Sequence, residues 1–211
     1  MRTGDSVVLL GGYDLEMLTI KEILQKENIK FLDKELQWGA KLSAYQNELK
    51  ELSDYTIYGI ELEEDISPPP NYQRIDHHND FSDKEASIVQ VLKLLGREPT
   101  RDQELIAHND IGHIEEMRCF GTTKEEIDDI RKRDRATQGV TAEDEAKALE
   151  EIKSIKEENR LYILETSLDK FSPIVDSFEK RPLLLYSKKS LTYYGDIEFL
   201  KKHYQEQIEQ K

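Results

Sequence analysis

Residues 72–78 of the chain read Tyr-Gln-Arg-Ile-Asp-His-His, a strand-like stretch that runs directly into an aspartate and two histidines. Apolar stretches of similar length occur earlier, over 7–10, 29–32 and 55–62. Segments with a helical spacing of apolar residues separate them, for example over 15–28. Strands that alternate with helices predict an α/β fold with a doubly wound, mostly parallel sheet.

Acidic residues and a histidine follow these predicted strands at the point where each strand ends. Asp14 and Glu16 come shortly after the first strand, and Glu61 lies at the end of the third. His77 follows the fourth strand, and Asp110 lies later in the chain. The carboxyl ends of strands in an open parallel sheet meet in one crevice, and divalent cations prefer carboxylate and imidazole ligands. The sequence therefore predicts a metal centre, with enough ligands for two ions.

Capping signals predict where the next helices begin. Ser82 and Glu85 have the spacing of a capping box for a helix that runs to about Gly96. Thr100 is expected to cap the following helix, which carries Asp110 near its end. We also expect an amphipathic helix over 40–52.

Changes in composition along the chain divide it into three expected parts. Residues 1–120 form the metal-binding α/β domain, residues 121–160 a charged helical segment with a fresh N-cap at Thr141, and residues 161–211 a small C-terminal α/β segment. Two strands and a terminal helix are expected in that last part, over 161–164, 182–187 and 196–208.

Charge and cysteine content restrict the class of protein. The chain has 44 acidic residues against 30 Lys and Arg, a net charge of −14, so it lacks the basic surface that long nucleic acids require. Cys119 is the one cysteine, so no intramolecular disulfide is possible, and we expect it to be a buried apolar residue. No stretch has the length of a signal-peptide core or a membrane span. The simplest interpretation is a soluble cytoplasmic protein.

The Asp-His-His block, with acids after the earlier strands, resembles the DHH phosphoesterase superfamily over roughly residues 5–115. Its members include exonucleases of single-stranded DNA, short-RNA hydrolases, cyclic-dinucleotide phosphodiesterases and family II inorganic pyrophosphatases. The resemblance implies a parallel-sheet domain that binds two divalent metal ions, most often manganese. It implies hydrolysis of a phosphoester or phosphoanhydride by a metal-activated water. Because the chain is acidic, we expect a small substrate such as a nucleotide or a short oligonucleotide.

The resemblance also implies a role for each residue of the motif. Asp14 would bind the first metal, and Glu61 would bridge the two ions. His78 would face the substrate or the edge of the metal centre, and Asp76 would orient its neighbours. The ligands of the second metal would be Glu16, His77 and Asp110.

The chain departs from the family pattern in three ways, and the first two favour an alternative function. Leu10 occupies the position of the family's first histidine ligand, and Glu16 and Glu61 replace aspartates. The family's glycine-rich second domain has no clear counterpart in residues 161–211. The alternative is a catalytically weak relative that binds a nucleotide or a partner.

Several other residues have two interpretations at this stage. His113 either replaces the missing histidine ligand or is a hydrogen-bonded structural residue. Arg131, Arg133 and Arg135 either bind substrate phosphate or form ion pairs with neighbouring acids. Trp38 either stacks on a base or packs inside the fold. The oligomeric state does not follow from the sequence.

Overall fold

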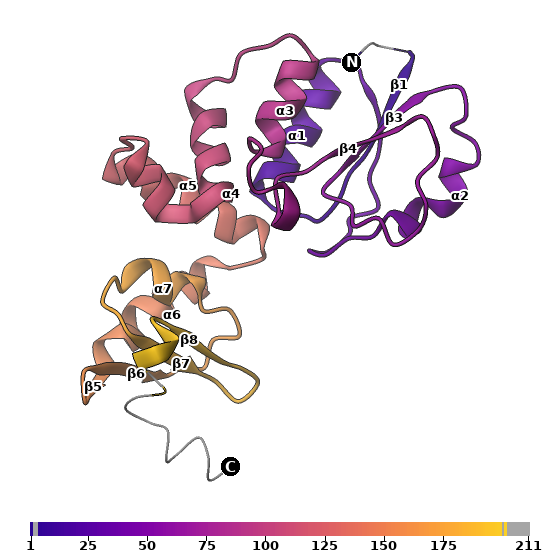
Figure 1. Cartoon of the computed structure of the whole chain (residues 1–211). Coiled ribbons are helices and arrows are strands. Elements are labelled where there is room, and N and C mark those ends of the chain that lie inside the picture. Colours follow the sequence, from indigo (N-terminus) through magenta and orange to yellow (C-terminus); the bar gives the residue numbers. More distant parts are fainter. Residues whose placement is uncertain (2–3, 200, 202–211) are drawn as a thin grey trace. The chain divides into compact units, whose positions relative to one another are not determined.

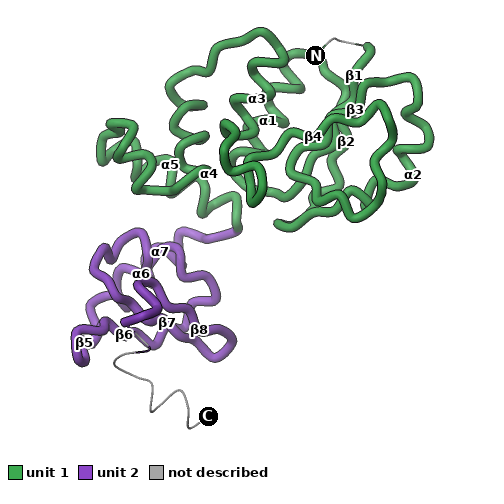
Figure 2. Tube along the Cα trace, viewed as in Figure 1, with its two compact units in different colours: residues 1–138 green, residues 139–211 purple. Residues whose placement is uncertain are grey.

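The computed structural model describes residue 1, residues 4–199 and residue 201, and the chain forms two compact units (Figure 2). The first is Met1–Gln138 and the second is Gly139–Lys211. The charged helical segment expected over 121–160 is therefore divided between the units. Its first helix packs Ile127 and Ile130 into the first unit, and its second helix buries Ala148 in the core of the second.

The first unit is built on a four-stranded sheet in which every strand pair is parallel, with the order β2-β1-β3-β4. Its strands are β1 (Ser6–Leu9), β2 (Lys30–Leu32), β3 (Thr56–Ile60) and β4 (Tyr72–Ile75). Val7, Val8 and Leu9 in β1 have no exposed surface. A central strand that is apolar on both faces is typical of a parallel sheet covered on both sides. The predicted mixed α/β fold with a parallel sheet is confirmed.

Helices cover both faces of this sheet (Figure 1). On one face, α1 (Leu15–Lys26) and α3 (Ser87–Leu94) pack around Val8, Ile20 and Ile88. On the other face, a 3-10 turn over Leu42–Tyr45 and the short helix α2 (Gln46–Leu49) enclose a second core with Val7 and Leu9.

The helices α4 (Arg101–Cys119) and α5 (Lys124–Thr137) complete the first unit. Thr100 caps α4 in a capping box with Gln103, as predicted. The helix α4 bends at Gly112 and His113, where the backbone leaves helical geometry. Asp110 therefore lies at the end of the first straight part of α4.

The second unit contains a mixed four-stranded sheet in the order β5-β6-β7-β8, with a parallel pair in the middle and antiparallel pairs outside. Its elements are α6 (Ala142–Glu151), β5 (Lys156–Glu158), β6 (Leu161–Glu165), α7 (Ser172–Ser177), β7 (Leu183–Tyr186) and β8 (Leu191–Tyr194). Thr141 caps α6 as predicted. Leu164, Ile174 and Leu185 form the centre of a separate apolar core.

Three local expectations differ from the structure, and a fourth extends past the described residues. The helix expected from Ser82 begins at Ser87, because residues 79–81 form a 3-10 turn and a distant side chain caps α3. The expected helix over 40–52 is interrupted where the 3-10 turn meets α2. Cys119 is exposed, since it lies on the outer face of α4 near its end. Of the terminal helix expected over 196–208, residues 197–199 and 201 are helical, Asp196 is not, and residues 200 and 202–208 lie outside the described residues.

Within the described residues, no helix combines the length and the apolar character needed to cross a membrane.

Candidate metal centre

Four side chains from three segments of the first unit converge at the carboxyl edge of the parallel sheet. They are Glu61, His77, His78 and Asp110, and each offers one ligand atom within 4.8 Å of the others. His77 Nε2 lies 2.7 Å from Asp110 Oδ2 and 3.5 Å from Glu61 Oε1. His78 Nε2 lies 3.6 Å from Glu61 Oε2. Donor atoms with these separations can surround a single cation, because metal–ligand bonds of about 2.0–2.6 Å place neighbouring ligands at such distances.

The backbone around Glu61 directs its carboxylate into the centre. Glu61 follows β3 directly and has a φ of 50°, a left-handed conformation that is rare for residues other than glycine. Its backbone N–H still donates to the carbonyl of Ile75. Gly11 leaves room for this turn, since a Cβ there would lie 2.4 Å from the carbonyl oxygen of Ile60. Strained residues of this kind cluster at functional sites.

Asp76 supports the two histidines from behind. It is buried, and its carboxylate accepts a fork of two hydrogen bonds from Arg74. Its other oxygen accepts the backbone N–H of His78 at 2.8 Å. Asp76 thus fixes the backbone of the pair rather than facing the centre, which agrees with its expected orienting role. His78 is the more open of the two histidines, with 34% of its side chain exposed against 4% for His77.

Glu16 lies against the four-residue cluster and also holds a helix. Its Oε2 is 3.6 Å from His77 Nε2, and its Oε1 accepts the N–H of Ile88 in the first turn of α3. Because the side chain is 1% exposed, both contacts occur away from water. The position predicted as a second-metal ligand is therefore beside the centre, with one oxygen available to it.

Asp14 is the N-cap of α1 and accepts the N–H of Met17 at 2.8 Å. It lies outside the four-residue cluster, but burial and the charges of Asp110 and Glu61 raise its pKa to about 7. The Asp14 carboxylate therefore interacts with two acids of the centre, although Asp14 is not one of its four clustered residues.

The centre contains buried polar atoms that lack hydrogen-bond partners. Whether a metal ion fits the centre depends on whether these atoms could act as its ligands. The unpartnered atoms are Glu16 Oε2, Glu61 Oε1, His77 Nε2 and Asp110 Oδ2. The short distance between His77 and Asp110 does not have hydrogen-bond alignment. Buried polar groups normally have hydrogen-bond partners, and a bound ion is one recognised reason for exceptions. Oxygen and imidazole donors converging in this way fit a divalent cation.

The electrostatics of the cluster are those of a site with too little positive charge. Burial would lower the pKa of His77, but the carboxylates of Asp110 and Glu16 outweigh it and raise that pKa to about 12. Burial would raise the pKa of Glu61, but contacts with His77 and His78 lower it overall. The pKa of Glu16 is raised, chiefly by burial. These raised pKa values favour the protonated forms of His77 and Glu16, and a bound divalent cation would supply the compensating positive charge instead.

The other residues that the sequence singled out are not part of the four-residue cluster. Leu10 is 1% exposed in the apolar core and offers no ligand atom to the centre. Arg133 pairs with Asp102 at 2.6 Å and with Asp129 at 3.4 Å on the surface, while Arg135 is 7% exposed. Trp38 is 85% exposed, so the packing interpretation is wrong and base stacking stays a prediction.

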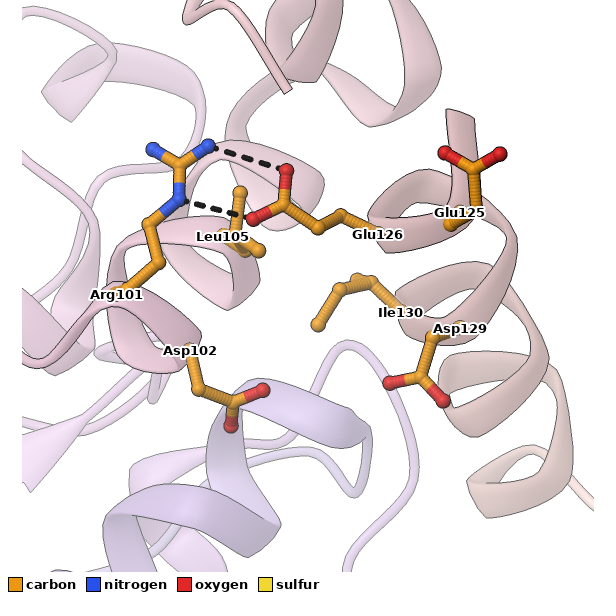
Figure 3. Close-up of a pocket in the computed structure, with 7 residues that line it drawn as sticks. All are labelled: Arg101, Asp102, Leu105, Glu125, Glu126, Asp129 and Ile130. Carbon is orange, nitrogen blue, oxygen red and sulfur yellow. Dashed lines mark hydrogen bonds and ion pairs between the residues drawn. The ribbon is translucent and has the colours of Figure 1, made fainter. Parts of the chain in front are cut away.

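A groove between α4 and α5 lies on that same surface and shows no metal-ligand convergence (Figure 3). Arg101 makes a two-pronged ion pair with Glu126 across it, which lowers the pKa of Glu126 to about 2. Asp102 is engaged by Arg133. Three of the four acids of this groove thus have an arginine partner, Glu126 in Arg101 and Asp102 and Asp129 in Arg133.

Sequence reasoning missed a buried network around Arg131. Its Nη1 donates to Asn109 Oδ1 at 2.9 Å and to Asp134 Oδ2 at 2.7 Å, and it lies 3.3 Å from His113 Nδ1. The contact supports the interpretation of His113 as a hydrogen-bonded structural residue. The sequence contained a signal for this network, because its polar members Asn109 and His113 lie within three residues of the expected ligand Asp110.

Comparisons with known proteins gave no match: no family model fits the sequence, and neither the curated proteins nor the solved structures contain a significantly similar chain.

Proposed function

We propose that the protein is a metal-dependent phosphohydrolase that acts on a small phosphoester or phosphoanhydride, such as a nucleotide or a short oligonucleotide. The observation that carries the proposal is the cluster of Glu61, His77, His78 and Asp110 at the carboxyl edge of a parallel sheet, with buried atoms that lack partners. The resemblance of residues 5–115 to DHH phosphoesterases suggests manganese as the ion.

Each residue of the centre would have a distinct part in this function. Glu61, His77 and Asp110 would hold the ion, and Asp76 would keep the histidines in place through the backbone of His78. A bound divalent ion supplies a Lewis acid for a phosphoryl oxygen and lowers the pKa of a water molecule. His78, the more exposed histidine, would contact the substrate phosphate or the leaving oxygen.

A second ion is part of the proposal, but fewer residues are placed to bind it. Asp14 and Glu16 are the residues that could hold it beside Glu61. Leu10 contributes no donor where the family has histidine. That absence of a ligand favours the alternative proposal, a catalytically weak protein that binds a nucleotide or a partner through one ion.

The substrate is proposed to be small because an extended anion needs many cationic contacts. Arg133 and Arg135 were the expected phosphate contacts, and Arg133 already pairs with Asp102. The proposed compartment is the cytoplasm, which suits a chain with a single cysteine.

The test is manganese-supported turnover of a dinucleotide and of a single strand of about 30 nucleotides at physiological salt. We expect faster turnover of the dinucleotide, and loss of turnover in Glu61→Gln. Glu63→Gln is the matched control, because Glu63 is an exposed acid two residues away. Turnover that survives in Glu61→Gln would refute the proposed site. Faster cleavage of the long strand would refute the proposed substrate size.

A further inference from the structure

The bend in α4 determines where Asp110 lies. Residues up to Ile111 are helical, and the helix resumes after Gly112 and His113. His113 has φ 53° and ψ −140°, a conformation that residues with a Cβ rarely adopt. Asp110, which lies 2.7 Å from His77, is two residues before the bend. Such a conformation persists where surrounding contacts hold it.

The side chain of Arg131 spans this bend from α5. Its Nη1 reaches Asn109 on the near side of the bend and His113 on the far side. Arg131 is 6% exposed and its contact with Asn109 is buried, whereas the contact with His113 is partly buried. One side chain therefore contacts residues on both sides of the bend, including the residue immediately before Asp110.

Asp134 keeps Arg131 in this position. The two side chains form a 2.7 Å ion pair with 7% and 6% of their surfaces exposed. Gln138 at the end of α5 donates to the other oxygen of Asp134 at 3.2 Å. A charge-assisted, buried network of this kind has few alternative arrangements.

We infer that Arg131 is a positioning residue of the metal centre: it fixes the bend in α4 and thereby the carboxylate of Asp110. The inference rests on the proposed metal-dependent function and adds a residue that touches neither the ion nor the substrate. Residues that orient metal ligands from behind commonly change metal affinity by about 10–100-fold when they are replaced.

The experiment is a calorimetric Mn²⁺ titration of the full chain carrying Arg131→Lys. Lysine keeps the charge but lacks the planar fork and reach of arginine. We expect Mn²⁺ affinity to fall by at least about tenfold. Arg133→Lys is the matched control, because it makes the same change two residues away on the exposed face. Affinity within about twofold of the original is expected there, since an exposed pair contributes little.

A double-mutant cycle with Asp110→Asn separates positioning from a general loss of structure. If Arg131 acts through Asp110, Arg131→Lys has little further effect in the Asp110→Asn background. Effects that add fully would overturn the inference. Thermal unfolding of the metal-free variants shows that the proteins compared are folded.

The outcomes distinguish this inference from the proposed function. If Asp110→Asn weakens Mn²⁺ binding and Arg131→Lys does not, the positioning role is wrong and the metal centre stands. If Asp110→Asn leaves Mn²⁺ binding unchanged, the assignment of Asp110 as a metal ligand is wrong. Should Arg131→Lys not fold, Asn109→Ala removes one arm of the network, and unchanged Mn²⁺ affinity in that variant would overturn the inference.

Discussion

Within the described parts of the two units, buried polar atoms without partners are found in the first unit and not in the second. Among the described residues, every such side-chain atom belongs to Met1–Gln138, and four of them lie in the metal centre. In the second unit, Glu151 is partly buried, but its carboxylate is bonded to Thr166 and Ser167. An unsatisfied buried group costs about 1–3 kcal/mol, so the first unit carries a polar arrangement that a ligand would compensate.

The largest expected effect is the loss of metal binding on His77→Ala. His77 lies within 3.6 Å of three carboxylates, whereas His113 contacts Arg131 and no member of the cluster. We expect Mn²⁺ affinity to fall by at least about a thousandfold, or roughly 4 kcal/mol. His113→Ala serves as the comparison and should lose clearly less. Calorimetric titration of both variants is the measurement, and equal or reversed losses would count against the assignment of His77.

The next effect concerns the second unit and should leave metal binding untouched. Leu185 in β7 has no exposed surface, so Leu185→Ala should destabilise that unit by about 2–5 kcal/mol. Faster hydrogen exchange at the amides of β6 and β7 would report it. Leu191→Ala in β8 is the matched control, because Leu191 is 68% exposed. If Leu185→Ala also abolished Mn²⁺ binding under folding conditions, the contrast between the two units would fail.

A smaller effect is expected from Tyr45→Phe behind the sheet edge. The Tyr45 hydroxyl donates to the carbonyl of Leu10 at 2.7 Å, and losing one hydrogen bond costs about 0.5–1.5 kcal/mol. Burial raises the pKa of Tyr45 from 10 to about 12. The folded state therefore favours the neutral phenol, and this contribution is complete below pH 10 and is lost as pH rises toward 12.

Denaturant unfolding at neutral pH and at about pH 11 tests this expectation. The difference in stability between the original protein and Tyr45→Phe should shrink at the higher pH. A difference that grows with pH would show that the hydroxyl is not buried as a neutral donor.

The sequence predicted the elements whose signals are local. The apolar stretches became parallel strands, and Thr100 and Thr141 cap the helices that follow them. The capping box expected at Ser82 did not form, because α3 receives its cap from Glu16, 72 residues away in the chain. Periodicity and local spacing contain no information on a tertiary cap of this kind.

The site shows the same division between local and distant signals. The rule that parallel strands end in one crevice predicted that Glu61 and His77 would meet, and the structure brings them together. That rule did not predict the bend at His113, whose side chain contacts Arg131 from another helix. Free cysteines are usually buried, so Cys119 was expected in the interior, but it lies exposed on α4.

The most direct test of the metal centre is a crystal structure of the Mn²⁺-loaded protein with anomalous diffraction at the manganese edge. We expect an anomalous peak surrounded by Glu61, His77, His78 and Asp110, and disappearance of that peak in His77→Ala. No peak at these residues in crystals grown with saturating Mn²⁺, or a peak at another surface alone, would contradict it.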